Sequence, residues 1–189
     1  MNKDLKVVLA VIAGAVTLCW GGSAVAYLIA RQALGQTYAT DPAQAAKIGH
    51  SIVDYTLPPG YLEQTAASSY GLKVVTIGPQ HGSTHSMTLA LMQVSAEWNA
   101  LQDDEEAFDP LGENEQEWSM PIVSTQTITI KGQPVILTVR EGSDSGGQRI
   151  RQASCTFPGR GNAMVVMAAS GAGDAWDQAA LDSFLASIK

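Results

Sequence analysis

The run from Val7 to Ala30 constrains this chain most, because its 24 consecutive residues include no charged side chain. As a helix, the run would be about 36 Å long, which exceeds the membrane hydrocarbon core of about 30 Å. The run therefore predicts a transmembrane anchor over residues 7–30, with the lipid bilayer as its partner. Residues 1–6 are then expected as a cytoplasmic N-terminus, residues 31–40 as a linker and residues 41–189 as an ectodomain.

The basic residues around this run predict its orientation in the membrane. Lys3 and Lys6 precede the run, whereas Arg31 is the only nearby cation on its far side. Positive charges flanking a membrane span favour the cytoplasmic side. We therefore expect a bacterial single-pass protein of the signal-anchor type, with a cytoplasmic N-terminus and an extracytoplasmic C-terminal domain.

Two other interpretations of the run compete with the anchor. Residues 7–20 also fit the apolar region of a cleavable signal peptide, with cleavage after Ala26 in Ala24-Val25-Ala26. The apolar character continues through residues 27–30, which a mature N-terminus does not need, so the uncleaved anchor is favoured. Lipidation of Cys19 is disfavoured because Leu18 precedes it, where bacterial lipoprotein processing requires a small residue.

The remaining 159 residues have the size and composition of one globular domain. They carry nine basic and 17 acidic residues, and this negative charge argues against a nucleic acid partner, which requires clustered Lys and Arg. Cys155 is the only cysteine after the apolar run, so a disulfide within the domain is impossible. Its strand-like surroundings predict a buried, inert thiol.

Hydrophobic periodicity and turn residues predict an α+β domain behind the N-terminal transmembrane helix. A flanking helix is expected from Asp41-Pro42 to about Asp54, and another from Asp174 to Ile188. A further helix is expected after Ser95, with Trp98 on its apolar side. We expect an antiparallel sheet of about six strands with the helices packed on it. The six strands are expected at Leu72–Ile77, Ser86–Val94, Met120–Ile130, Val135–Arg140, Arg149–Phe157 and Ala163–Ala169.

A family resemblance supports this layout. Residues 55–61, Tyr-Thr-Leu-Pro-Pro-Gly-Tyr, resemble the P-x-G-W/Y opening of small PsbP/Mog1-like domains, and the closing residues 181–188 are also similar to that group. The resemblance extends over Ile52–Ile188, although Tyr61 stands where tryptophan is usual and the acidic insertion is atypical. It implies a binding or assembly module rather than an enzyme, and it assigns no site. Bacterial single-span membrane proteins with such an ectodomain are similar in layout.

The candidate metal ligands lie in two segments. His81 and His85 are four residues apart, but the glycines and proline around them predict a loop rather than a helix that would align the two rings. The acidic loop 102–118 carries eight carboxylates and no cation, without the alternating pattern that wraps calcium. A solvated loop is favoured over a metal site for both segments. The weak candidate ligands are His81, His85, Asp103, Asp104, Glu105 and Glu106.

Two glycine-containing motifs lack the surroundings of the signatures that they resemble. Asp144-Ser145-Gly146-Gly147 is similar to the nucleophile motif of trypsin-like proteases, but no segment supplies an aligned histidine base. Gly171-Ala172-Gly173 is similar to a dinucleotide-binding turn, but Trp176 stands where a third small residue is needed. We therefore assign no catalytic or cofactor-binding residue and expect no cofactor.

The sequence thus predicts a membrane-anchored, non-enzymatic ectodomain, an accessory or assembly component that acts through protein–protein contacts. The first alternative is a module that binds a small ligand or a divalent metal ion through the 81–85 loop and the acidic segment. The second alternative is a hydrolase with an unrecognised site that uses His50, His81 or His85 in acid–base catalysis.

Overall fold

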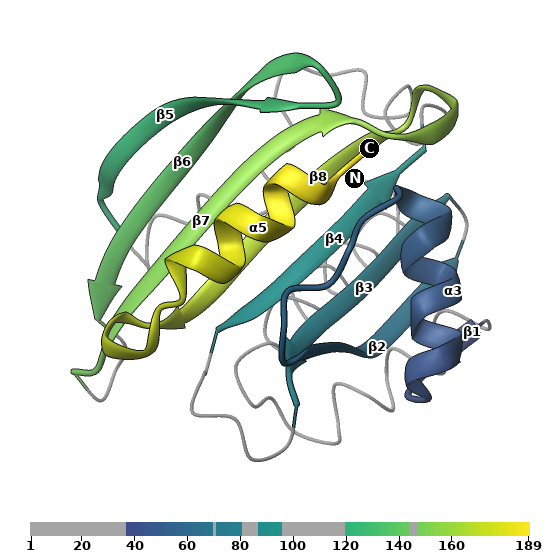
Figure 1. Cartoon of the computed structure of the whole chain (residues 1–189), viewed down its shortest axis with the longest axis horizontal. Coiled ribbons are helices and arrows are strands. Elements are labelled where there is room, and N and C mark those ends of the chain that lie inside the picture. Colours follow the sequence, from purple (N-terminus) through teal and green to yellow (C-terminus); the bar gives the residue numbers. More distant parts are fainter. Residues whose placement is uncertain (1–36, 70, 81–86, 96–119, 144–146) are drawn as a thin grey trace, which may run out of the picture.

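The computed structural model describes residues 37–69, 71–80, 87–95, 120–143 and 147–189 (Figure 1). These residues form two α-helices, two short 3-10 helices and eight strands. In chain order the elements are β1 (Thr37–Ala39), α3 (Pro42–Ile52), β2 (Tyr61–Ser69), β3 (Leu72–Pro79), β4 (Thr88–Val94), β5 (Ile122–Ile130), β6 (Gln133–Ser143), β7 (Arg149–Pro158), η1 (Arg160–Asn162), β8 (Met164–Ala172), η2 (Gly173–Ala175) and α5 (Gln178–Ser187).

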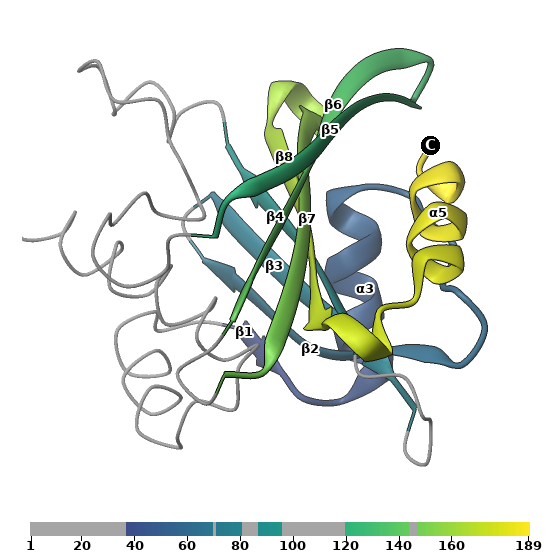
Figure 2. The same cartoon turned by 90° about the vertical axis from the view of Figure 1, so that its left-hand side faces the viewer.

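The eight strands form a single sheet in the order β1-β2-β3-β4-β8-β7-β6-β5, and every neighbouring pair is antiparallel. Both helices lie on the same face of this sheet (Figure 2). In Figure 1, α3 lies over β2 and β3, and α5 crosses in front of β7 and β8. The β5–β6 hairpin forms one end of the sheet, and the short β1 forms the other.

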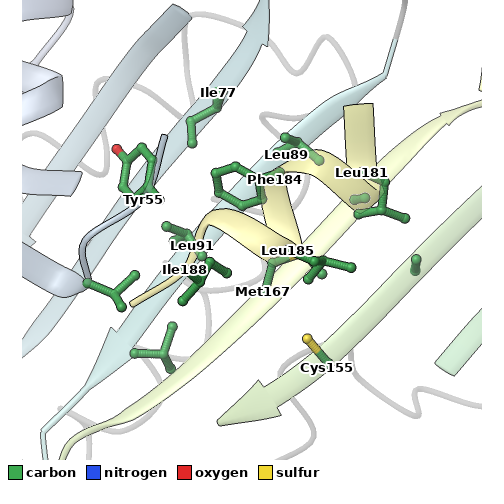
Figure 3. Close-up of a cluster of buried hydrophobic side chains, with 14 of the residues drawn as sticks. Tyr55, Ile77, Leu89, Leu91, Cys155, Met167, Leu181, Phe184, Leu185 and Ile188 are labelled. Carbon is green, nitrogen blue, oxygen red and sulfur yellow. The ribbon is translucent and has the colours of Figure 1, made fainter. Parts of the chain in front are cut away.

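The core lies between the sheet and the two helices. Strand residues alternate between buried and partly exposed positions, so one face of each strand supplies apolar side chains to the core. The helix α5 contributes Leu181, Phe184 and Leu185 from its inner face, and Figure 3 shows them over Leu89, Leu91 and Met167 of the central strands. Cys155 is buried in the same cluster, which confirms the prediction of a buried thiol.

The N-terminal helix begins where the sequence predicts. The Asp41 carboxylate accepts a hydrogen bond from the backbone N–H of Gln44 at 3.1 Å, and Pro42 occupies the first turn. The C-terminal helix begins three residues later than predicted. Its cap is Asp177, whose carboxylate accepts from the N–H of Ala180 at 2.9 Å, because the residues around Asp174 form the separate short helix η2 instead.

The fold predicted from the sequence is wrong in its stated form. The sheet has eight strands instead of about six, because β1 and β2 are strands that the sequence pattern did not reveal. β1 lies within residues 31–40 and pairs with β2. The predicted transmembrane helix is not part of this architecture: within the described ranges, no helix is long and apolar enough to cross a membrane. Residues 7–30 themselves and the helix expected after Ser95 lie outside the described residues.

Candidate functional site

The two edges of the sheet differ in what they offer to a partner. β1 has only three residues, whereas β5 is a nine-residue strand that pairs with β6 on one side. No described strand pairs with its other side, which forms the outer margin of the sheet in Figure 1. An edge strand of this length presents a row of backbone donors and acceptors on which another strand can pair.

The turn between β5 and β6 determines which backbone groups face outward. Lys131 and Gly132 both have positive φ, at 53° and 74°, which is typical of a two-residue type I′ hairpin turn. Ile130 and Gln133 flank this turn and pair with each other, so they exchange backbone hydrogen bonds. Hydrogen-bonded and non-hydrogen-bonded pairs then alternate along the ladder.

The alternation places every second residue of β5 with its N–H and C=O directed away from β6. Pro134 fits this assignment, because it pairs with Thr129 at a non-hydrogen-bonded position, where its missing N–H costs the hairpin nothing. A bulge between Ile122 and Ser124 ends the regular part of the ladder. The residues with outward backbone groups in the regular part are Thr125, Thr127 and Thr129.

The side chains of this edge are uncharged and partly apolar. The strand Ile122–Ile130 contains no charged residue and no proline, although the chain carries a formal net charge of −7. Ile122 and Val123 are 54% and 50% exposed, and Ile136, which lies opposite Thr127 on β6, is 59% exposed. Native edge strands usually carry charges or proline that prevent pairing, and this one has neither, so it is the described feature best suited to binding.

The core side of the hairpin is held firmly. Ile130, Val135 and Leu137 are buried, and Ile128 packs against the same core. The helix α5 contacts β5 directly. The outer edge is therefore presented by a strand whose other groups are already fixed, and this lowers the entropic cost of adding a partner strand.

The metal ligands expected from the sequence are not described by the structure. The residues His81, His85, Asp103, Asp104, Glu105 and Glu106 all lie outside the described ranges, as does most of the Asp144–Gly147 motif. Within the described part of the chain, no three histidine, cysteine, aspartate or glutamate side chains come together as a metal site. His50 is described, and it lies on α3 rather than beside a second histidine.

A buried polar cluster that the sequence analysis missed lies beneath α3. The Tyr55 hydroxyl donates a hydrogen bond to Oε1 of Glu63 at 3.2 Å, and Glu63 is only 6% exposed. Burial and the neighbouring carboxylate both raise the pKa of the Tyr55 phenol, which keeps it protonated as a donor. The exposed His50 stacks on the Tyr55 ring with centroids 4.6 Å apart. The cluster fixes the segment after α3 to β2.

A second polar cluster joins β6 and β7 on the helix-bearing face. Glu141 forms ion pairs with Arg149 and Arg151, and the Arg151 guanidinium lies 5.1 Å from the ring centroid of Trp176. The hydrogen bond from Arg149 lowers the pKa of the Glu141 carboxyl. Because Glu141 pairs with both arginines, this cluster connects β6 to β7.

Comparison with known proteins gives no family for this chain. The sequence matches no protein-family model, and no curated protein is significantly similar to it. The resemblance to PsbP/Mog1-like domains therefore stays a hypothesis.

The burial of Cys155 predicts a loss of stability at alkaline pH. Burial raises the pKa of this thiol to about 12, whereas a cysteine in an unfolded chain titrates near 9. The folded state keeps its proton while the unfolded state loses one, so this group lowers the free energy of unfolding by about 1.4 kcal/mol per pH unit as the pH rises from 9 towards 12. Cys155→Ala should remove this slope in urea unfolding measured at pH 8, 9, 10 and 11.

Both proteins in this comparison should carry Cys19→Ser, so that one thiol alone differs. Burial also raises the pKa of Tyr61 to about 12, so the Cys155→Ala variant keeps some loss of stability at the upper end of the range. The quantity to compare is therefore the difference in the free energy of unfolding between the two proteins at each pH. Parallel pH profiles for the two would show that the Cys155 thiol titrates alike in the folded and unfolded states.

Proposed function

We propose that this chain is a non-enzymatic accessory or assembly component that is held at a membrane by residues 7–30 and contacts another protein through the outer edge of β5. The observation that supports this function is the nine-residue, uncharged edge strand with outward backbone groups on Thr125, Thr127 and Thr129. The membrane attachment rests on the uncharged run alone, with the N-terminus on the cytoplasmic side and the domain outside.

The chemistry of the edge indicates how the partner binds. Addition of an extended strand to an open sheet edge gains main-chain hydrogen bonds, while alternate side chains of the incoming strand provide specificity. The side chains of the three threonines lie on the face of the sheet opposite the helices. Thr127 pairs with Ile136, whose side chain is exposed on that face, whereas the neighbouring Gln126 and Ile128 pair with residues of β6 that are buried on the helix-bearing face. A partner strand would therefore meet a β-branched surface of mixed apolar and hydroxyl character.

Photocrosslinking in native membranes tests this function. A photoreactive phenylalanine derivative in place of Thr125 lies on the edge of β5 with which no described strand pairs, and illumination should give a covalent adduct with a protein. The matched control places the same residue at Lys47, an exposed position on α3. An adduct at position 125 that is absent at position 47 supports the proposal. Equal yields at both positions, or none at either, would contradict it.

A further inference from the structure

We infer that the partner at the β5 edge is a second copy of this chain, paired antiparallel through β5 about a two-fold axis at Thr127. This inference rests on the proposed function and specifies its partner. The two sheets, each of eight strands, would join into one continuous antiparallel sheet. The argument uses the hydrogen-bond pattern of the edge, the pairing of its side chains and the charge of the chain.

The hydrogen-bond pattern determines the register. Two antiparallel copies of β5 exchange hydrogen bonds only where outward residues face outward residues. Pairing about Thr127 places Thr125 opposite Thr129 of the other copy and Thr127 opposite itself. All three outward residues of each copy are then used, whereas a two-fold centre on any other residue leaves at least one of them without an outward partner in the regular stretch. The bulge at Val123 lies beyond this stretch.

The side chains are compatible with self-pairing in this register. On the face opposite the helices, threonine meets threonine at all three hydrogen-bonded pairs, a combination that stabilises cross-strand contacts. On the helix-bearing face, Gln126 meets Ile128 and Ser124 meets Ile130. A two-fold axis perpendicular to the sheet keeps these two faces distinct, so the helices of both copies lie on the same side.

The absence of charged side chains from residues 122–130 favours a second copy as the partner of β5. Two chains of net charge −7 repel each other, so a stable contact between them requires a surface without like charges. Residues 122–130 provide such a surface, and the described charges beside it are the cations Lys131 at the turn and Arg140 opposite Ile122. A basic partner strand would find no counter-charge on β5. Association of two copies should therefore strengthen with added salt, whereas a basic partner would dissociate.

A charge exchange at Thr127 tests the two-fold axis. In the full chain in mild detergent, Thr127→Lys and Thr127→Glu each place like charges directly opposite one another, and each should weaken dimerisation by about tenfold or more in sedimentation equilibrium. An equimolar mixture of the two variants should restore pairing, because lysine then faces glutamate. The matched control is Thr156→Lys, an exposed threonine of β7 between the buried Cys155 and Phe157 and away from the β5 edge, which should leave dimerisation unchanged.

A disulfide test measures the same contact without a charge. Residues in a hydrogen-bonded antiparallel pair have Cα atoms about 5.5 Å apart, which suits a disulfide. With Cys19→Ser in the background, Thr127→Cys should form an intermolecular disulfide on mild oxidation. Ile136→Cys should not form one, because the two β5 strands lie between the two β6 strands. The Cα atoms at position 136 of the two copies are then three strand spacings, or about 14 Å, apart. The native Cys155 is buried and stays outside the reaction.

Three outcomes would overturn this inference: a wild-type chain that is monomeric at about 100 μM, single Thr127 variants that dimerise normally, or equal disulfide yields at positions 127 and 136. The proposed function can fail separately. If copies do not pair but position 125 crosslinks to a different protein, the edge is a binding site whose partner is not a second copy. If neither result appears, both proposals are wrong.

Discussion

Phe184→Ala is expected to lower the free energy of unfolding by about 3–5 kcal/mol, because it removes a fully buried aromatic ring from the centre of the core. Phe184 projects from α5 toward the sheet, where its ring lies 5.4 Å from the ring of Tyr55 at an interplanar angle of 60° (Figure 3). Its removal therefore loses apolar burial and an aromatic contact together. Urea unfolding of the full chain, followed by tryptophan fluorescence, measures the change.

The matched control for this variant is Ser183→Ala, at the exposed neighbouring position on α5. It should change the free energy of unfolding by less than about 0.5 kcal/mol, because surface substitutions away from special features rarely cost more. Similar losses for the two variants would mean that α5 is stabilised by helix formation rather than by packing of its inner face. A loss at Phe184 alone would assign the stability to the core.

Gly49→Val is expected to destabilise the protein by about 3 kcal/mol, even though helix propensity alone favours valine over glycine by a few tenths of a kcal/mol. A Cβ atom at position 49 would lie 2.1 Å from the Tyr55 hydroxyl oxygen and 3.3 Å from Cγ1 of Val75. Valine would displace the Tyr55 hydroxyl from Glu63 and leave a buried carboxylate without its donor. Thermal or urea unfolding measures the loss.

Lys47→Val provides the comparison for Gly49→Val, since it places the same β-branched residue at an exposed position of the same helix. Propensity predicts that Lys47→Val is the more harmful of the two, whereas packing against Tyr55 predicts the reverse by several-fold. A stabilised Gly49→Val protein would show that α3 can move away from the sheet at little cost. The two variants thus separate the local preference of the helix from its tertiary contact.

These core contacts also bear on the candidate interaction surface. The helix α5, which carries Phe184, contacts β5, and the buried Ile130 and Leu137 attach the hairpin to the same core. A loosened core should therefore weaken the ordered presentation of Thr127 at the edge. The inner side of β5 is occupied by these contacts, and the proposed function assigns its outer edge to another strand.

Local signals in the sequence were sufficient for several elements. Asp41-Pro42 carries its own capping carboxylate and proline, so the start of α3 depends on neighbouring residues alone. Lys131-Gly132 forms a tight hairpin turn for the same reason, since both residues adopt the positive φ that such a turn requires. The burial of Cys155 followed from alternation along its strand. Each of these features is determined within a few residues.

Only the tertiary structure decided β2 and the role of Glu63. The strand Tyr61–Ser69 ends in two alanines and two serines, which favour no strand by themselves, and it forms because β1 and β3 pair with it on both sides. Glu63 looks like a surface residue in the sequence, but the Tyr55 hydroxyl makes its burial tolerable. Both outcomes depend on residues that are distant along the chain or in other strands.

The candidate site divides in the same way. The sequence by itself determined that Ile122–Ile130 is uncharged, β-branched and joined to its neighbour by a tight turn. That this strand lies at the edge of the sheet, and that Thr125, Thr127 and Thr129 direct their backbone groups outward, followed only from strand order and register. Strand order is set by long-range packing of whole faces against the helices, and no short segment of sequence encodes it.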